Sequence, residues 1–121
     1  MRHEGLYLTD IVEAAGYIAE FIAGIDFEAF EKSELLRSAV VHKLSVIGEA
    51  AARVSEELKA KNHQVPWAQI VAFRNILVHA YFGIDWDVVW GAAKNRCPVL
   101  REQIKQILGE ESTHPEDEHP R

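Results

Sequence analysis

Apolar side chains recur at steps of three and four residues along most of this 121-residue chain, and this spacing limits the fold more than any other feature. Such steps place apolar side chains on one face of an α-helix. Sustained two-residue alternation, and the Asn-Gly or Asp-Gly turns typical of β-hairpins, are missing from the sequence. The sequence therefore predicts an all-α protein.

Residues that start and stop helices divide the first half of the chain. We expect a first helix over residues 6–24 and a short connecting turn over residues 27–31. Ser33 suits the N-cap of a second helix, whose apolar stripe predicts that it runs to about Lys61.

The second half is divided in the same way. Pro66 suits the first turn of a third helix, which Gly83 is expected to end. Asp85 caps a fourth helix, whose stripe continues to residue 107 through a kink or break at Pro98. Four such helices joined by short loops predict an antiparallel bundle of four to five helices.

Composition and length favour one domain. The chain has 48% hydrophobic residues, enough for a core, and a single cysteine, Cys97, which cannot form an internal disulfide. Neither a membrane-spanning run nor a signal peptide is recognisable, so we expect a cytoplasmic protein without membrane contact. Residues 1–108 are the predicted helical domain, and residues 109–121, which lack apolar periodicity, are a predicted acidic disordered tail.

Charge is distributed unevenly along the chain. The formal net charge is −6, yet residues 35–108 carry 10 Lys and Arg against 6 Asp and Glu. A basic middle between acidic ends leaves room for an anionic partner, although solvated helix faces are the plainer interpretation.

Arg74 breaks the apolar pattern of the third helix. At about 100° per residue, Arg74 lies roughly 20° from Trp67, in the middle of the apolar stripe. An unpaired guanidinium in a core costs too much free energy to persist. Arg74 must therefore pair internally, be covered by another subunit, or face a groove that binds an anion. Glu49, among the small residues of the segment IGEAA, is the candidate internal partner.

Further polar residues lie close to Arg74 in the sequence. Asn75 and His79 are four residues apart on a neighbouring helix face, and Tyr81 lies just before the expected helix end. A structural Arg–Glu pair beside an ordinary His and Tyr explains this cluster as well as a functional site does. His42 shares a helix face with Glu49, which we interpret as a surface arrangement.

At these residues the sequence resembles a known family. The segment RNILVHAY reads R-x4-H-x-Y with Asn after the Arg, and it resembles the signature of HepT-like toxins of the HEPN superfamily. The segments IGEAA, Pro66-Trp67 and YFGID fall in the family's order, so the resemblance covers about residues 6–108.

This resemblance implies a fold and a function. It implies an all-α homodimer that is the toxin of a HEPN/MNT type VII toxin–antitoxin module and a metal-independent endoribonuclease. Arg74 and His79 would be catalytic across the dimer interface, with Asn75 and Glu49 in supporting or RNA-binding roles. The antitoxin would be a minimal nucleotidyltransferase (MNT) that transfers AMP from ATP to Tyr81.

The side chains suit this chemistry. RNA breaks when its 2′-OH attacks the adjacent phosphorus, a reaction that needs a base, which histidine can be, and positive charge on the phosphorane, which arginine supplies. The histidines are not spaced as a metal site and a phosphate-binding Gly-rich loop is missing, so we expect neither a metal nor a cofactor.

Two other hypotheses remain open from the sequence. The bundle could be a non-catalytic nucleotide- or partner-binding subunit of a nucleotidyltransferase complex. It could also be a purely structural dimeric bundle in which Arg74 pairs with Glu49.

Overall fold

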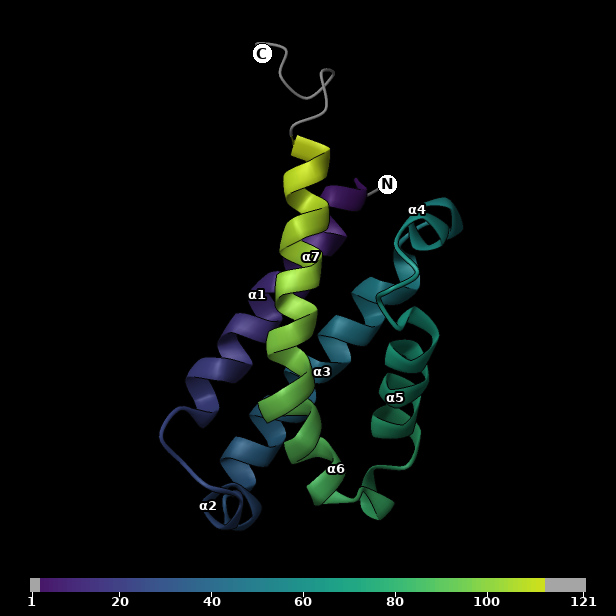
Figure 1. Cartoon of the computed structure of the whole chain (residues 1–121). Coiled ribbons are helices and arrows are strands. Elements are labelled where there is room, and N and C mark those ends of the chain that lie inside the picture. Colours follow the sequence, from purple (N-terminus) through teal and green to yellow (C-terminus); the bar gives the residue numbers. More distant parts are fainter. Residues whose placement is uncertain (1–2, 113–121) are drawn as a thin grey trace.

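A computed structural model describes residues 3–112 and confirms an all-α fold, with no strand in that part of the chain. Four longer helices form its body (Figure 1): α1 (Glu4–Ile22), α3 (Glu34–Arg53), α5 (Trp67–His79) and α7 (Cys97–Ser112). Shorter elements connect them: α2 (Phe27–Lys32), α4 (Glu56–Lys61), the 3₁₀ turn η1 (Tyr81–Gly83), α6 (Trp86–Gly91) and the π-helical segment η2 (Ala92–Arg96).

The core lies between α1, α3 and α7. Helix α3 packs against α1 and against α5, and α7 packs along α1 (Figure 1). The apolar stripes predicted from the sequence are buried there, and Leu8, Ile11, Ile18, Val40 and Ile104 are fully inaccessible to solvent. Burial of these side chains supplies the main stabilising free energy of such a bundle.

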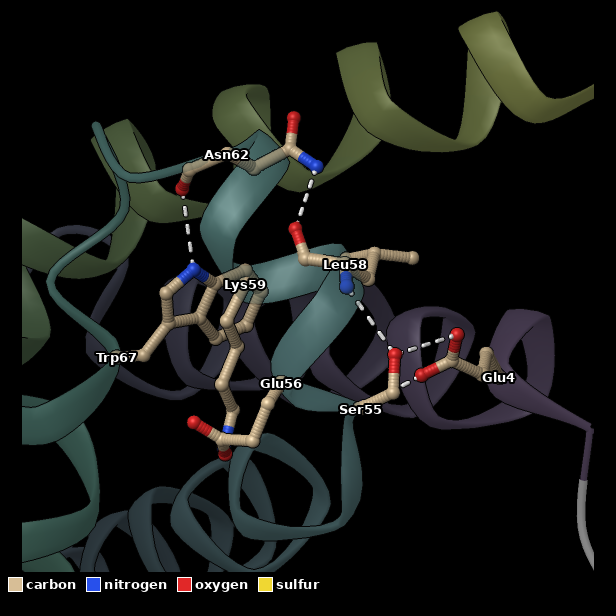
Figure 2. A network of polar contacts seen from close by, with 7 residues as sticks. All are labelled: Glu4, Ser55, Glu56, Leu58, Lys59, Asn62 and Trp67. Carbon is tan, nitrogen blue, oxygen red and sulfur yellow. Dashed lines mark hydrogen bonds and ion pairs between the residues drawn. The ribbon is translucent and has the colours of Figure 1, made fainter.

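The second helix ends earlier than predicted, and the expectation that it reaches Lys61 is wrong. Helix α3 ends at Arg53, and Val54 adopts an extended conformation. Ser55 then caps the separate helix α4 by accepting a hydrogen bond from the backbone N–H of Leu58 at 3.1 Å. Ser55 also donates its backbone N–H and its hydroxyl to Glu4 of α1, at 2.6 and 3.0 Å (Figure 2). These contacts stabilise the break because they satisfy the polar groups that it exposes.

The loop after α4 fixes where α5 begins. The side-chain amide of Asn62 donates to the carbonyl oxygen of Leu58 at 2.9 Å, and the indole N–H of Trp67 donates to the carbonyl of Asn62 at 3.0 Å (Figure 2). Trp67 is buried, so its ring anchors the first turn of α5 against the bundle. Pro66 is the N-cap just before this turn, one residue earlier than its predicted place within the first turn.

The third helix also ends earlier than expected. Helix α5 stops at His79, because Ala80 leaves the helical conformation (φ −129°, ψ 39°), and a 3₁₀ turn carries the chain to Gly83. The expected helix end at Gly83 is therefore one turn too late.

The break predicted near Pro98 is confirmed. Asp85 caps α6 by accepting from the backbone N–H of Asp87 at 3.0 Å. The helical path then widens into the π-helical segment over residues 92–96, and Pro98 follows in the first turn of α7. Because proline lacks an N–H and crowds the carbonyl four residues earlier, a widened turn at this point relieves the clash.

Helix α7 continues to Ser112, so the boundary expected at Gly109 is too early for the start of the tail. The rest of the predicted acidic tail lies outside the described residues. Within residues 3–112, none of the helices combines the length and apolar character needed to cross a membrane.

Candidate active site

Arg74 lies at a close approach of α5 to α3, directly against Gly48. A Cβ atom at Gly48 would lie 2.2 Å from Cβ and 2.6 Å from Cγ of Arg74, so this contact requires glycine on α3. The aliphatic stem of Arg74 therefore crosses α3 directly at Gly48. The close approach expected from the small residues around Glu49 is confirmed.

The guanidinium of Arg74 makes two polar contacts. Its Nη2 donates to Oε2 of Glu49, and its Nη1 donates to Oδ1 of Asn75 at 2.6 Å. Among the arrangements that the sequence left open for Arg74, internal pairing with Glu49 is therefore present.

Glu49 has a second cationic partner on its own helix. Nη2 of Arg53 donates to Oε1 of Glu49 at 2.9 Å. Hydrogen bonds from Arg53, and to a smaller extent from Arg74, lower the pKa of Glu49 below 4.5. The same hydrogen bond between Arg53 and Glu49 raises the pKa of Arg53. Glu49 is therefore ionised at neutral pH and shared between two guanidinium groups.

These residues line an open groove of about 500 Å³ between α1, α3 and α5. Arg53, Glu49 and Arg74 form one wall, and the groove also contains Tyr7 and His42. The Arg74 side chain keeps 28% of its surface exposed. Arg74 consequently pairs internally and faces an open groove at the same time.

His79 does not join Arg74 in this groove. It is the last residue of α5 and is exposed. Five residues of α-helix correspond to a rotation of about 140° beyond one full turn, so Arg74 and His79 project from different faces of α5. Within a single chain the two predicted catalytic residues are therefore not brought together.

Tyr81 follows the end of α5 on the turn η1, in agreement with its predicted place at a helix end. Its ring makes edge-to-face contacts with Phe82 and Trp86, at centroid distances of 5.8 and 6.1 Å. The residue is 39% exposed, so another protein can approach it from solvent.

Two groove residues were not assigned to a site from the sequence. Arg53 lies four residues after Glu49, a spacing that predicts an ion pair on one helix face and could have identified it. His42 is exposed, as its surface interpretation requires, but the structure also places it in the groove with Arg74.

Other reactive groups in the described part contribute little to this site. Burial raises the pKa of Cys97 to about 12, so its thiol is protonated and a poor nucleophile at neutral pH. Residues 3–112 contain no cluster of three or more His, Cys, Asp or Glu side chains positioned to hold a metal ion.

The fold and the site together define a class: a small helical bundle whose open groove presents arginines suited to a phosphate-containing ligand. The sequence model of the family described as Ribonuclease HepT-like matches residues 11–107, and the chain belongs to this family of the HEPN superfamily.

Curated relatives agree with this assignment. The chain is 36% identical over 101 residues to "Putative RNase MJ1380" of Methanocaldococcus jannaschii, an alignment that covers 84% of this chain and 93% of the relative. It is also 36% identical over 101 residues to "Probable ribonuclease HepT" of Thermococcus cleftensis, covering 84% and 92%. No solved structure matches significantly.

Proposed function

We propose that this chain is a metal-independent endoribonuclease and the toxin of a toxin–antitoxin module. The observation that carries the proposal is Arg74, which belongs to the segment that resembles the HepT-like signature and which lines an open groove. A guanidinium has five N–H donors, so Arg74 can bind a phosphate oxygen while it keeps Glu49 and Asn75 as partners.

The proposed reaction is internal transfer within the RNA. A base removes the proton of the 2′-OH, the 2′ oxygen forms a bond to phosphorus, and the bond from phosphorus to the 5′ oxygen breaks. An acid returns a proton to the departing 5′ oxygen, which leaves a cyclic phosphate and a 5′-OH. His79 supplies proton transfer, and Arg74 stabilises the negative charge of the phosphorane.

The separation of Arg74 and His79 on α5 favours a site shared by two chains. We propose a homodimer in which His79 of one protomer acts beside Arg74 of the other. An apolar groove of about 700 Å³ between α3, α5, α6 and α7 supports contact with a second copy. Val88 and Val99 line this groove as exposed apolar side chains, and a second copy would bury them.

Tyr81 is the proposed site of neutralisation. A minimal nucleotidyltransferase antitoxin would catalyse attack of the Tyr81 oxygen on the α-phosphorus of ATP, with release of pyrophosphate and of the phenol proton. The attached AMP adds negative charge and bulk at the end of α5, which opposes binding of RNA phosphates. The partial exposure of Tyr81 supports access by such an enzyme.

Expression and RNA sizing test the proposal. The wild-type chain should arrest growth and fragment RNA, and both effects should disappear in Arg74→Ala and in His79→Ala while the helical circular dichroism spectrum remains. Cleavage should persist in EDTA. If either variant stays fully active, or if EDTA abolishes cleavage and a divalent ion restores it, the mechanism is wrong.

Coexpression with the cognate nucleotidyltransferase tests neutralisation. Intact mass should rise by one or more AMP units, tandem mass spectrometry should place them on Tyr81, and Tyr81→Phe should accept none. An unmodified Tyr81 in a neutralised complex would indicate steric occlusion by the antitoxin instead.

The Arg74–Glu49 pair favours a second candidate, a non-catalytic bundle in which Arg74 has a structural role. In that case Arg74→Ala would lower stability, and the purified wild-type chain would leave RNA intact. Cleavage by the pure wild-type protein that requires Arg74 excludes this candidate.

A further inference from the structure

Glu49 lies between two guanidinium groups from neighbouring helices. Arg53 of α3 contacts one carboxylate oxygen at 2.9 Å, and Arg74 of α5 contacts the other. One carboxylate neutralises only one of two positive charges, so this cluster of Arg53, Glu49 and Arg74 carries a net positive charge.

The ion pairs elsewhere on the described helices differ from this cluster. Glu28 pairs with Lys32, and Glu57 pairs with Lys61, each through a single contact on one exposed helix. Exposed pairs of that kind add little to helix stability. Arg53 and Glu49 form an exposed i,i+4 pair of this kind too, so the feature that sets the cluster apart is that one carboxylate is shared by two arginines.

The cluster is also open to solvent on its groove side. Arg53 keeps 58% of its side-chain surface exposed and Glu49 keeps 43%. His42 and Ser45 line the same groove and offer donors, while Tyr7 and the carboxylate of Asp10, which each have interactions of their own, complete this part of the lining. Exposed guanidinium groups beside hydroxyl donors are suited to binding phosphate oxygens.

We propose that Arg53 binds a second phosphate of the RNA, next to the scissile phosphate held by Arg74. Arg53 is then a positioning residue: it fixes the strand in the groove between α1, α3 and α5, and it takes no part in bond breaking. Because Arg53 also holds Glu49, this carboxylate stays in place while Arg74 binds the substrate phosphate. The inference rests on the proposed ribonuclease function.

Salt dependence of RNA binding separates a phosphate contact from a structural role. The logarithm of the RNA association constant falls linearly with the logarithm of the salt concentration, and for single strands each phosphate contact adds about 0.7 to the steepness of this fall. We would use a 2′-O-methyl RNA oligonucleotide, which cannot be cleaved by 2′-oxygen attack. With it, Arg53→Gln in the full chain should make the slope shallower by roughly 0.7. Arg53→Lys should restore the slope, since lysine keeps the charge.

Cleavage kinetics give the second measurement. Arg53→Gln should raise KM for a cleavable RNA by about fivefold to tenfold near 0.15 M salt, with kcat within about twofold, because one charge-assisted phosphate contact is lost. Lys61→Gln is the matched control, since it removes the cation of an i,i+4 ion pair outside the groove. It should change neither the slope nor KM.

The outcomes distinguish this inference from the proposed function. If the wild-type chain neither binds nor cuts RNA, the proposed function fails and the inference fails with it. If the wild-type chain cuts RNA but Arg53→Gln keeps the wild-type salt slope, only the role of Arg53 is overturned. A loss confined to kcat would likewise overturn it, because that result assigns Arg53 to the chemical step.

Discussion

Helix α3 packs differently against its two sides, and the contrast explains which parts of this protein could be predicted. In the core shared with α1 and α7, α3 contributes buried apolar side chains such as Val40 and Ile47. The contact of α3 with α5, here called the α3–α5 seam, is formed by Gly48, Glu49 and Arg74. At this seam the glycine permits close approach of the two helices, and the charged groups of Glu49 and Arg74 pair with each other.

Buried apolar packing lies on one side of α3, and the charged groups of the proposed site lie on the other. Apolar packing in the core tolerates no charge, because an unpaired charge there is too costly. The seam can hold charged groups because its guanidinium and carboxylate groups pair with one another and remain partly exposed. Substitutions on the two sides should therefore differ in their effect on the free energy of unfolding.

The largest expected effect is in the core. Ile18 on α1 is fully buried, so Ile18→Ala should lower the free energy of unfolding by about 2–5 kcal/mol. Val78 on α5 lines the groove and is 51% exposed, so Val78→Ala should cost less than about 1 kcal/mol. Urea denaturation followed by circular dichroism at one protein concentration measures both. Equal losses would contradict the division between the buried core and the open groove beside the seam.

Two glycines test the close approach at the seam. A glycine-to-alanine change inside a helix normally gains about 1 kcal/mol from helix propensity. At Gly48 the new Cβ would overlap the Arg74 stem, so Gly48→Ala should instead lose about 1–3 kcal/mol and reduce RNA cleavage.

Gly16 on α1 is the matched control for Gly48. A Cβ there would meet the guanidinium of Arg101 at 3.0 Å, which is the flexible end of a side chain that can move. Gly16→Ala should therefore change the free energy of unfolding by less than about 1 kcal/mol in either direction. If both variants unfold alike in thermal melts, Gly48 is not a point of required close approach.

The smallest expected effect is the pH dependence of the charged cluster. Arg53 and Arg74 lower the pKa of Glu49 in the folded chain, so the ionised carboxylate stabilises the fold above its unfolded pKa near 4.5. This contribution is lost as pH falls through the lowered pKa. Because Glu49 is 43% exposed, solvent screening keeps the contribution below about 1 kcal/mol at pH 7.

Glu49→Gln measures that contribution. The difference in unfolding free energy between wild type and Glu49→Gln should be present at pH 7 and should shrink below about pH 4.5, as protonation removes the wild-type charge. Urea titrations at several pH values follow it. A difference that grows on acidification would contradict the sign assigned to this pKa.

The sequence was informative where the deciding interactions are local. The stripes located the core residues, and Asp85 and Pro98 marked the start and the break of the fourth helix, because capping and ring crowding act within one turn. The second helix was predicted too long because its break is stabilised by Glu4, 51 residues before Ser55. Val54 and Leu58 are both buried, so the apolar stripe continues in register through the break. Periodicity alone therefore gives no sign that the helix ends at Arg53.

The candidate site was predictable in part for the same reason. The wheel position of Arg74 and the small residues beside Glu49 together predicted their pairing as one alternative, and the structure contains it. Helix periodicity separates the directions of Arg74 and His79 by about 140°, but it could not show that α5 ends at His79 or that His79 lies outside the groove.

The all-α fold, the place of Arg74 on an apolar stripe and the resemblance to HepT-like proteins follow from the amino-acid sequence, because periodicity and motif are properties of consecutive residues. The sharing of Glu49 by Arg53 and Arg74, and the place of this cluster in an open groove, became visible in the folded chain. Those facts depend on the rotation and separation of α3 and α5, which are set at Gly48 by the packing of two helices.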